Sequence, residues 1–238
     1  MPALVSRALP SDPLLVRRHQ KPGLPYVFTG FSPGCSGGTE PDAFNLVLLG
    51  NAVPHLNLLV RSIVAISGGV CRLQALDYQK TPVPLVTATD GGIDNLPVLD
   101  AAELMTLSRP DFAGIRRIRL KLLTPLRLLH NGRELNHFEP ELFVRALLRR
   151  ISALAACYGE RADPEWFRHC AARAADLRLD EGGSSRAPVA GDGRGVLGSY
   201  LVSGPWQELG PLLVVGSLLH LGKGAAYGRG AFQVTPCA

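Results

Sequence analysis

The sequence predicts an α+β protein in which strands and helices alternate through two successive units. Apolar residues make up 46% of the 238 residues, which is enough for a folded core. Alternating and helical apolar patterns follow one another along the chain. Clusters of glycine and proline separate these patterns. We therefore expect an N-terminal domain over residues 1–112 and a C-terminal domain over residues 113–238.

The first half reads as strands around one helix. Strands are expected at 24–32, 43–53 and 71–79. A helix is expected at 54–66, where Pro54 suits the first turn and apolar residues recur at helical spacing. Strand, helix and strand of these lengths are typical of half a ferredoxin-like unit. Residues 80–113 are predicted to be irregular.

The second half repeats this alternation. Residues 115–132 predict a strand in which Arg117, Arg119 and Lys121 alternate with apolar residues and form a basic face. Helices are expected at 139–159, 163–179 and 205–222, strands at 196–204 and 230–234, and a loop of small residues at 180–195. The same alternation in both halves predicts tandem ferredoxin-like (RRM-like) domains.

The charge balance favours a nucleic-acid partner. Lys and Arg number 25 against 20 Asp and Glu, and arginine supplies nearly all of the positive charge. Arginine forks onto phosphates and stacks on bases. A GC-rich genome, which encodes arginine in excess, is the other explanation of this composition. On the helix at 139–159, Arg145, Arg149 and Arg150 share a spacing that forms either a basic stripe or an ordinary solvated face.

Cysteine spacing and hydropathy exclude several classes of protein. The 5 cysteines form no C-x-x-C pair, and no carboxylate or histidine cluster has metal-site spacing. We therefore expect no metal, no cofactor and no disulfide framework. The chain shows no signal peptide and no apolar run long enough for a membrane span. These features predict a cytoplasmic protein.

A basic glycine loop near the C-terminus is the most informative motif, "GKGAAYGRG" at 222–230. Its glycines permit positive φ angles and let backbone N–H groups face a ligand, while its basic and aromatic side chains suit phosphates and bases. The candidate ligand-binding residues are Gly222, Lys223, Gly224, Tyr227, Gly228, Arg229 and Gly230. The spacing departs from that of a Walker phosphate loop and of a dinucleotide fingerprint, and the loop precedes a strand rather than a helix. The residues alone leave a ligand loop and a plain connector equally open.

The segment "LLHLGKGAAYGRGAFQV", with "VLGSYLVSGPWQELGPLL" and "LTPLRLL" before it, resembles the CRISPR repeat-cleaving endoribonucleases of the RAMP superfamily. The resemblance extends over roughly residues 24–236. It implies two ferredoxin-like domains, binding of CRISPR repeat RNA, and metal-independent cleavage of precursor crRNA. In that reaction a 2′-hydroxyl attacks the phosphate and leaves a 2′,3′-cyclic phosphate.

Two departures from the family qualify the resemblance. The family has a strand and a helix ahead of the segment like "LPYVFTG", so the first domain is expected to be truncated here. The family also has a strand bearing serine and arginine where this chain has "DEGGSSRAPVAGDGRG". A non-catalytic RAMP subunit that holds crRNA among other effector subunits is therefore the main rival. An enzyme that binds a small phosphorylated molecule on the glycine loop is a third interpretation.

The resemblance also suggests roles for individual residues. His19 is the candidate general base, because related enzymes carry a histidine near this point and histidine transfers protons near neutral pH. Lys21 and Arg18 are the candidates for neutralising charge on the phosphorane, although "RRHQK" also fits a loosely held basic tail. His55 and His220 fit structural roles better, whereas His130 and His137 flank a turn that suits RNA contact. The expected RNA contacts are the glycine loop together with Arg117, Arg119, Lys121 and Arg149.

Overall fold

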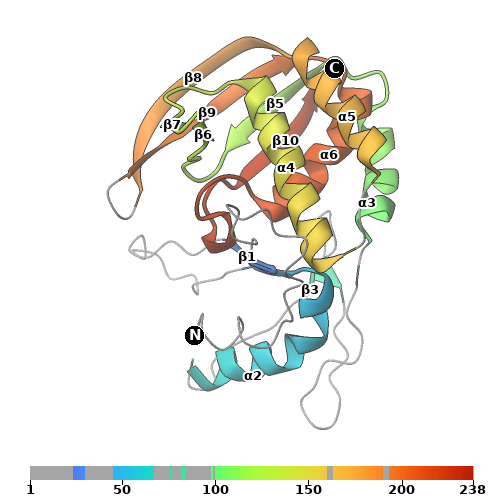
Figure 1. Ribbon diagram of the computed structural model, residues 1–238, viewed down its shortest axis with the longest axis vertical. Helices are drawn as coiled ribbons and strands as arrows, with labels where there is room; N and C mark the ends of the chain where they lie inside the picture. Colours follow the sequence, from blue (N-terminus) through green and yellow to red (C-terminus); the bar gives the residue numbers. More distant parts are fainter. Residues whose placement is uncertain are drawn as a thin grey trace.

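A four-stranded antiparallel sheet organises the second half of the chain. The computed structural model describes residues 24–29, 45–66, 75–76, 82–83, 98, 100–159, 163–189 and 193–237. The sheet contains β5 (Arg117–Leu122), β8 (Arg178–Val189), β9 (Gly193–Ser203) and β10 (Phe232–Cys237), in the order β10-β5-β9-β8. Each pair of neighbours is antiparallel. Helices α4 (Pro140–Tyr158), α5 (Pro164–Arg173) and α6 (Trp206–Leu219) pack against the sheet (Figure 1).

The order of elements explains why this half closes around one core. Apart from a small hairpin between β5 and α4, the elements from β5 to β10 follow as strand, helices, strand, strand, helix and strand, which is the order typical of a ferredoxin-like unit. The core joins both layers, with Ile118 and Leu120 from β5 buried against Leu147 of α4 and Leu212 of α6. Gly216 in α6 makes the close helix packing possible, because a Cβ there would lie 2.5 Å from Leu147 Cδ2.

β5 confirms the predicted basic strand. Its residues alternate between exposed and buried, so Arg117, Arg119 and Lys121 face outward. The strand is shorter than the predicted 115–132. The remaining residues turn and form a small hairpin, β6 (Leu129–His130) and β7 (Arg133–Glu134). Asn131 and Gly132 both have positive φ, 51° and 76°, as a two-residue hairpin turn requires.

The three predicted helices of the second half are confirmed. α4 begins at Pro140, where the missing N–H costs no hydrogen bond, and ends before Gly159. α5 is shorter than predicted and passes into a 3-10 turn, η3 (Ala174–Asp176). In the part of the chain that the structure describes, no helix combines the length and the apolar character needed to cross a membrane.

The predicted loop at 180–195 is wrong, because most of it belongs to the long hairpin formed by β8 and β9. Small residues make this pairing possible. The ring of Tyr200 is buried beside β8, and a Cβ on Gly182 would lie 2.5 Å from its Cδ1 atom. The hydroxyls of Ser184 and Tyr200 are 3.0 Å apart, and the ring stacks on Phe138 with centroids 4.0 Å apart. Glycine and serine here provide space for a tyrosine rather than a flexible link.

The described residues of the first half form smaller pieces. β1 (Tyr26–Thr29) pairs with β2 (Asn45–Leu48), and β3 (Ala75–Leu76) pairs with β4 (Pro82–Val83). The predicted helix is confirmed as α2 (Leu56–Ile66), preceded by a 3-10 helix, η1 (Gly50–His55). The predicted strand at 43–53 therefore ends at Leu48. That these pieces belong to a truncated first ferredoxin-like domain stays a prediction.

One helix lies where the sequence predicts irregular chain. α3 (Ala101–Ser108) begins at Asp100, whose side chain accepts hydrogen bonds from the N–H groups of Ala102 and Glu103. Leu104 packs with Val215 and Leu219 of α6. The 3-10 helix η2 (Arg109–Phe112) follows, and Phe112 is buried in the main core against Gly210. The chain just before residue 113 thus packs on the second half.

Candidate functional site

The glycine loop, residues 222–230, connects α6 to β10 and lies against β1 (Figure 1). Its backbone is held in left-handed turns, with φ of 88° at Gly222, 84° at Gly224, 83° at Gly228 and 62° at Gly230. Only glycine adopts such angles without strain. Between them, Ala225–Tyr227 forms a 3-10 turn, η4, in which the two alanines are buried. The loop is therefore a shaped and packed element.

Most backbone donors of the glycine loop bind within the protein, which corrects the expectation that they face a ligand. The N–H of Lys223 donates to the carbonyl of Arg127 at 3.0 Å, and that of Gly230 donates to Pro125 at 3.2 Å. The N–H groups of Tyr227 and Arg229 both donate to the carbonyl of Gly224. These groups stabilise the loop. The side chains are therefore the main groups of the loop that are left for contact with a ligand.

The glycines are also required by close packing. A Cβ on Gly222 would lie 2.3 Å from the carbonyl oxygen of Arg127, and one on Gly230 would lie 1.8 Å from that of Leu221. A Cβ on Gly224 would approach Arg229 Cδ to 2.8 Å, so the arginine side chain lies across this glycine. The fold alone thus accounts for these three glycines, and the evidence for a ligand rests on the charged and aromatic residues between them.

Three side chains leave the glycine loop toward its surroundings. Lys223 is exposed, Arg229 is half-buried, and Tyr227 keeps 58% of its surface exposed although its hydroxyl hydrogen bonds to Tyr26 of β1. Burial raises the pKa of Tyr26, and the charge and hydrogen bond of Tyr227 raise it further. Tyr26 is therefore a neutral hydroxyl near neutral pH. The tyrosine pair joins the first half of the chain to the loop.

The basic face of β5 leads toward the glycine loop. Lys121 pairs with Gln233 of β10, and Arg119 pairs with Thr235, and all four residues are exposed. Beyond Lys121 the strand ends, and the N–H of Leu123 donates to the carbonyl of Ala231 at 2.8 Å, directly after the loop. The end of the basic strand β5 and the end of the glycine loop therefore lie next to each other.

The three arginines of α4 do not form the basic stripe considered from the sequence. Arg150 is half-buried, and its Nε and Nη2 atoms donate to the carbonyl of Leu219 at 3.0 and 2.8 Å. Burial lowers the pKa of this guanidinium, which stays charged at neutral pH. Arg145 pairs with Glu141 at 2.9 Å, and Arg149 is exposed. Arg150 binds the C-terminal end of α6, and sequence patterns do not predict this contact because Leu219 lies 69 positions away in the chain.

The candidate catalytic residues His19, Lys21 and Arg18 lie outside the described residues. Among the described histidines, His220 is buried at the end of α6, which agrees with a structural role. His55 is exposed at the end of η1.

The remaining described histidines each lie close to a neighbouring polar side chain. His130 is exposed in the β6–β7 hairpin, 3.1 Å from Asn131 Nδ2. His169 lies 2.6 Å from Glu208, which Arg173 also binds. Burial raises the pKa of Glu208, but its bonds with His169 and Arg173 outweigh burial and hold it below the ordinary value. This cluster joins α5 to α6.

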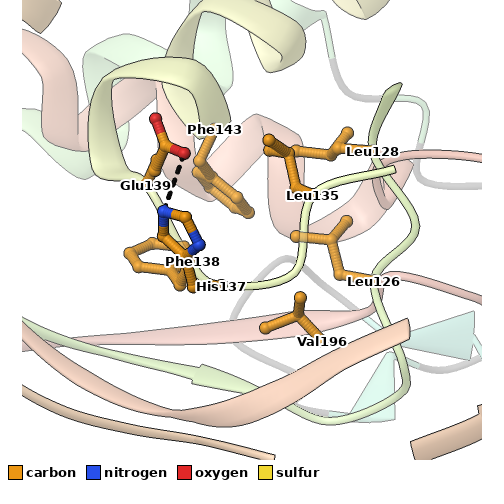
Figure 2. Close-up of a pocket in the computed structure, with 8 residues that line it drawn as sticks. All are labelled: Leu126, Leu128, Leu135, His137, Phe138, Glu139, Phe143 and Val196. Carbon is orange, nitrogen blue, oxygen red and sulfur yellow. Dashed lines mark ion pairs between the residues drawn. The ribbon is translucent and has the colours of Figure 1, made fainter. Parts of the chain in front are cut away.

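A recess beside the β6–β7 hairpin is too small to be a ligand pocket (Figure 2). Apolar side chains including Leu126, Phe143 and Val196 line it, and His137 meets Glu139 at its edge, with Nε2 and Oε1 2.9 Å apart. Its empty volume of about 220 Å³ includes solvent at the mouth, below the roughly 300 Å³ at which small-molecule sites begin. Among the described residues, no three His, Cys, Asp or Glu side chains are grouped so that they could hold a metal ion.

The comparison with protein families returns one match. Residues 120–232 match the family "CRISPR-associated endoribonuclease Cas6". The matched segment begins within β5 and ends at the first residue of β10, so it includes the glycine loop. No curated protein sequence matches the chain.

Solved structures share the fold at low sequence identity. A Cas6 of Thermus thermophilus, in a product complex, has a TM-score of 0.56 and 17% identity, and the alignment covers 99% of this chain and 90% of that one. A second Cas6 in a product complex has a TM-score of 0.53 and 18% identity, with 89% and 84% covered. The same protein bound to a substrate mimic has a TM-score of 0.52 and 17% identity, and the alignment covers 89% of this chain and 85% of that one. These likenesses establish the fold.

Proposed function

We propose that the chain is a Cas6-type endoribonuclease that binds CRISPR repeat RNA and processes it into crRNA, because residues 120–232 match the Cas6 family. The observation that carries the proposal is the family match over residues 120–232. The matched segment contains the glycine loop, where Lys223 and Tyr227 are exposed on a rigid backbone. The related Cas6 structures were captured with a product and with a substrate mimic, which supports RNA as the ligand.

The described surface suits RNA backbone more than RNA bases. Arg119 and Lys121 supply charge along β5, and Lys223 and Arg229 extend it to the glycine loop. Cations in such a row neutralise phosphates and release their counterions. Tyr227 supplies one exposed ring on which a base can stack. With only 6% aromatic residues in the chain, phosphate contacts should contribute most of the affinity.

We propose cleavage by attack of a 2′-hydroxyl on the adjacent phosphate, without a metal. The 2′-hydroxyl gives its proton to a base and its oxygen bonds to phosphorus, while the 5′ oxygen leaves and takes up a proton. The products are a 2′,3′-cyclic phosphate and a 5′-hydroxyl. The protein must align this attack in line, accept the proton of the 2′-hydroxyl and neutralise the charge of the phosphorane. A histidine suits the proton transfer and cations suit the charge.

His19 remains our candidate for the general base, with Lys21 and Arg18 as the charge-neutralising candidates. In sequence His19 precedes Leu24, the first described residue, by five positions, and the chain then enters β1. β1 contacts the glycine loop through Tyr26 and Tyr227. This connection between the start of β1 and the loop supports the assignment of both regions to one site.

Incubation of the full chain with its labelled cognate repeat RNA in EDTA tests the proposal. We expect a single cut and a cyclic-phosphate end, and we expect His19→Ala to lower the cleavage rate by about 100-fold or more without a matching loss of affinity. His55→Ala is the matched control, because His55 is an exposed histidine in η1, outside the glycine loop. If the His19→Ala variant still cleaves the RNA, another residue must be the general base.

The same experiment separates the rival functions. Tight binding without cleavage by the wild-type chain would favour a non-catalytic subunit that holds crRNA with other effector proteins. No binding at all would refute the RNA proposal. A phosphorylated small molecule as ligand has little support, since the glycine loop leads into β10 rather than into a helix.

We also propose that the chain consists of two ferredoxin-like domains, 1–112 and 113–238, the first of them truncated. The support is the complete element order of the second unit. Because α3 and Phe112 pack on α6, a fragment meant to contain the second unit should begin before Ala101. Association with other effector subunits and a cytoplasmic location stay predictions.

A further inference from the structure

The glycine loop is held in place by the segment that follows β5, residues 124–127. The carbonyls of Pro125 and Arg127 accept hydrogen bonds from Gly230 and Lys223. Both of these bonds join backbone atoms, so they depend little on which side chains are present. Thr124 differs, because it holds the loop through its side chain.

The hydroxyl of Thr124 bridges two points of the chain around the glycine loop. Its Oγ1 atom donates to the carbonyl of Gly228 at 2.8 Å and accepts from the N–H of Ala231 at 2.9 Å. Thr124 is partly buried, so these bonds compete little with water. One oxygen thus connects the end of β5 to both sides of the last turn of the loop.

This bridge controls the part of the loop that carries functional side chains. The carbonyl of Gly228 lies between Tyr227 and Arg229 in the chain, and Gly228 itself has a φ of 83°. The backbone at a glycine has many accessible φ and ψ angles, and a hydrogen bond to the glycine carbonyl stabilises one of these conformations over the others. Fixing this carbonyl therefore fixes the directions in which the Tyr227 ring and the Arg229 side chain leave the backbone.

We propose that Thr124 is a positioning residue for RNA binding, which holds Tyr227 and Arg229 in the orientation that meets the RNA. The proposal rests on the proposed function of the glycine loop. Thr124 itself makes no contact with RNA in this proposal. It acts only through the two hydrogen bonds of its hydroxyl, so a side chain of the same shape without that hydroxyl should lose the effect.

Two substitutions separate the hydroxyl from the shape of the side chain. Thr124→Val keeps the branched shape and removes both hydrogen bonds, whereas Thr124→Ser keeps the hydroxyl. We expect Thr124→Val to weaken binding of labelled cognate repeat RNA by about five- to tenfold, because misdirecting Tyr227 and Arg229 should cost about as much affinity as losing one hydrogen bond to the RNA. Thr124→Ser should restore most of the affinity. Thermal unfolding of each full-length variant would show that it is folded.

A structural defect alone would also weaken binding, so the decisive readout is coupling. In a chain that already carries Tyr227→Ala and Arg229→Ala, Thr124→Val should cost no further affinity, because the side chains that it positions are gone. Its effect on the unfolding temperature should persist in that background. An equal loss of affinity in both backgrounds would overturn the proposal.

Hydrogen exchange of residues 224–231 gives a readout that does not need RNA. Thr124→Val should speed exchange of the Ala231 N–H, and unchanged exchange would show that the hydroxyl does not hold the glycine loop. Faster exchange with unchanged RNA affinity would overturn the positioning role alone. If the wild-type chain does not bind RNA, the proposed function and this inference both fail. The wild-type binding measurement therefore distinguishes that outcome from a failure of the positioning role alone.

Discussion

Two regions of this protein are rich in glycine and small residues, and the structure uses them in opposite ways. In the glycine loop, the glycines at 222, 224, 228 and 230 all have positive φ, so they set the path of the backbone. In the β8–β9 hairpin, Gly182, Gly183, Gly195 and Gly198 lie in paired strands without positive φ. The glycines of the loop allow backbone conformations with positive φ, and those of the hairpin leave space for neighbouring atoms such as the ring of Tyr200.

The two regions meet at the same short segment, residues 124–127. The N–H groups of Lys223 and Gly230 in the glycine loop donate to carbonyls of this segment, and Leu126 exchanges two hydrogen bonds of 2.8 Å with Val196 of β9. Gly195 packs on Pro125, where a Cβ would lie 2.7 Å from the proline Cβ. Glycine content alone therefore does not distinguish a binding loop from a strand. The surrounding packing and the charged residues make the difference.

The largest effect is expected from Gly230→Ala in the glycine loop. The substitution forces alanine into a φ of 62° and places its Cβ 1.8 Å from the backbone oxygen of Leu221. Strain and overpacking together should lower the free energy of unfolding by about 3 kcal/mol. Urea unfolding monitored by circular dichroism measures this loss. A loss below about 1 kcal/mol would show that the loop tolerates a different backbone path.

A smaller loss is expected from Gly182→Ala in the hairpin. Its Cβ would lie 2.5 Å from Cδ1 of the Tyr200 ring, so overpacking should cost about 1–3 kcal/mol. Unlike a clash with backbone, this clash can be relieved. In a chain that carries Tyr200→Leu, the added cost of Gly182→Ala should fall toward zero, as a double-mutant cycle of urea unfolding would show. Additive losses would mean that the tyrosine is not the reason for the glycine.

The sequence predicts the parts of the fold whose signals are local. The alternation of Arg117, Arg119 and Lys121 with apolar residues is enough to predict β5, and Pro140 with the helical pattern after it is enough for α4. β8 carries no apolar alternation, because its stability comes from pairing with β9 and from Tyr200. Asp100 and Glu103 have the spacing of a helix start, and α3 begins there within the segment predicted to be irregular.

The candidate site was predictable only at the level of residue types. The charged and aromatic residues of the glycine loop stand out in the sequence, and the structure places Lys223 and Tyr227 at the surface. The use of the loop's backbone donors by Pro125 and Arg127 could not be predicted, since these partners lie about a hundred positions away. The burial of Arg150 against Leu219 was hidden for the same reason.

A binding comparison would show which of the two regions meets RNA. Lys223→Ala should weaken binding of the repeat RNA by roughly fivefold, or about 1 kcal/mol. It should also reduce the slope of log affinity against log salt by about 0.7 to 0.9. Arg194→Ala, which removes an exposed cation from the hairpin, should change both quantities less. The reverse order would place the main RNA contact on β8 and β9 instead.

The smallest effect, with the opposite sign, is expected from Gly183→Ala in β8. A Cβ at this position would meet no atom within 4 Å, and the residue is exposed in a strand without positive φ. Alanine should therefore raise the free energy of unfolding by about 0.5 kcal/mol, mainly by restricting the unfolded chain. Urea unfolding beside Gly230→Ala compares the two kinds of glycine directly. A clear loss at Gly183 would mean that β8 needs backbone freedom as well as space, and the distinction between the two regions would fail.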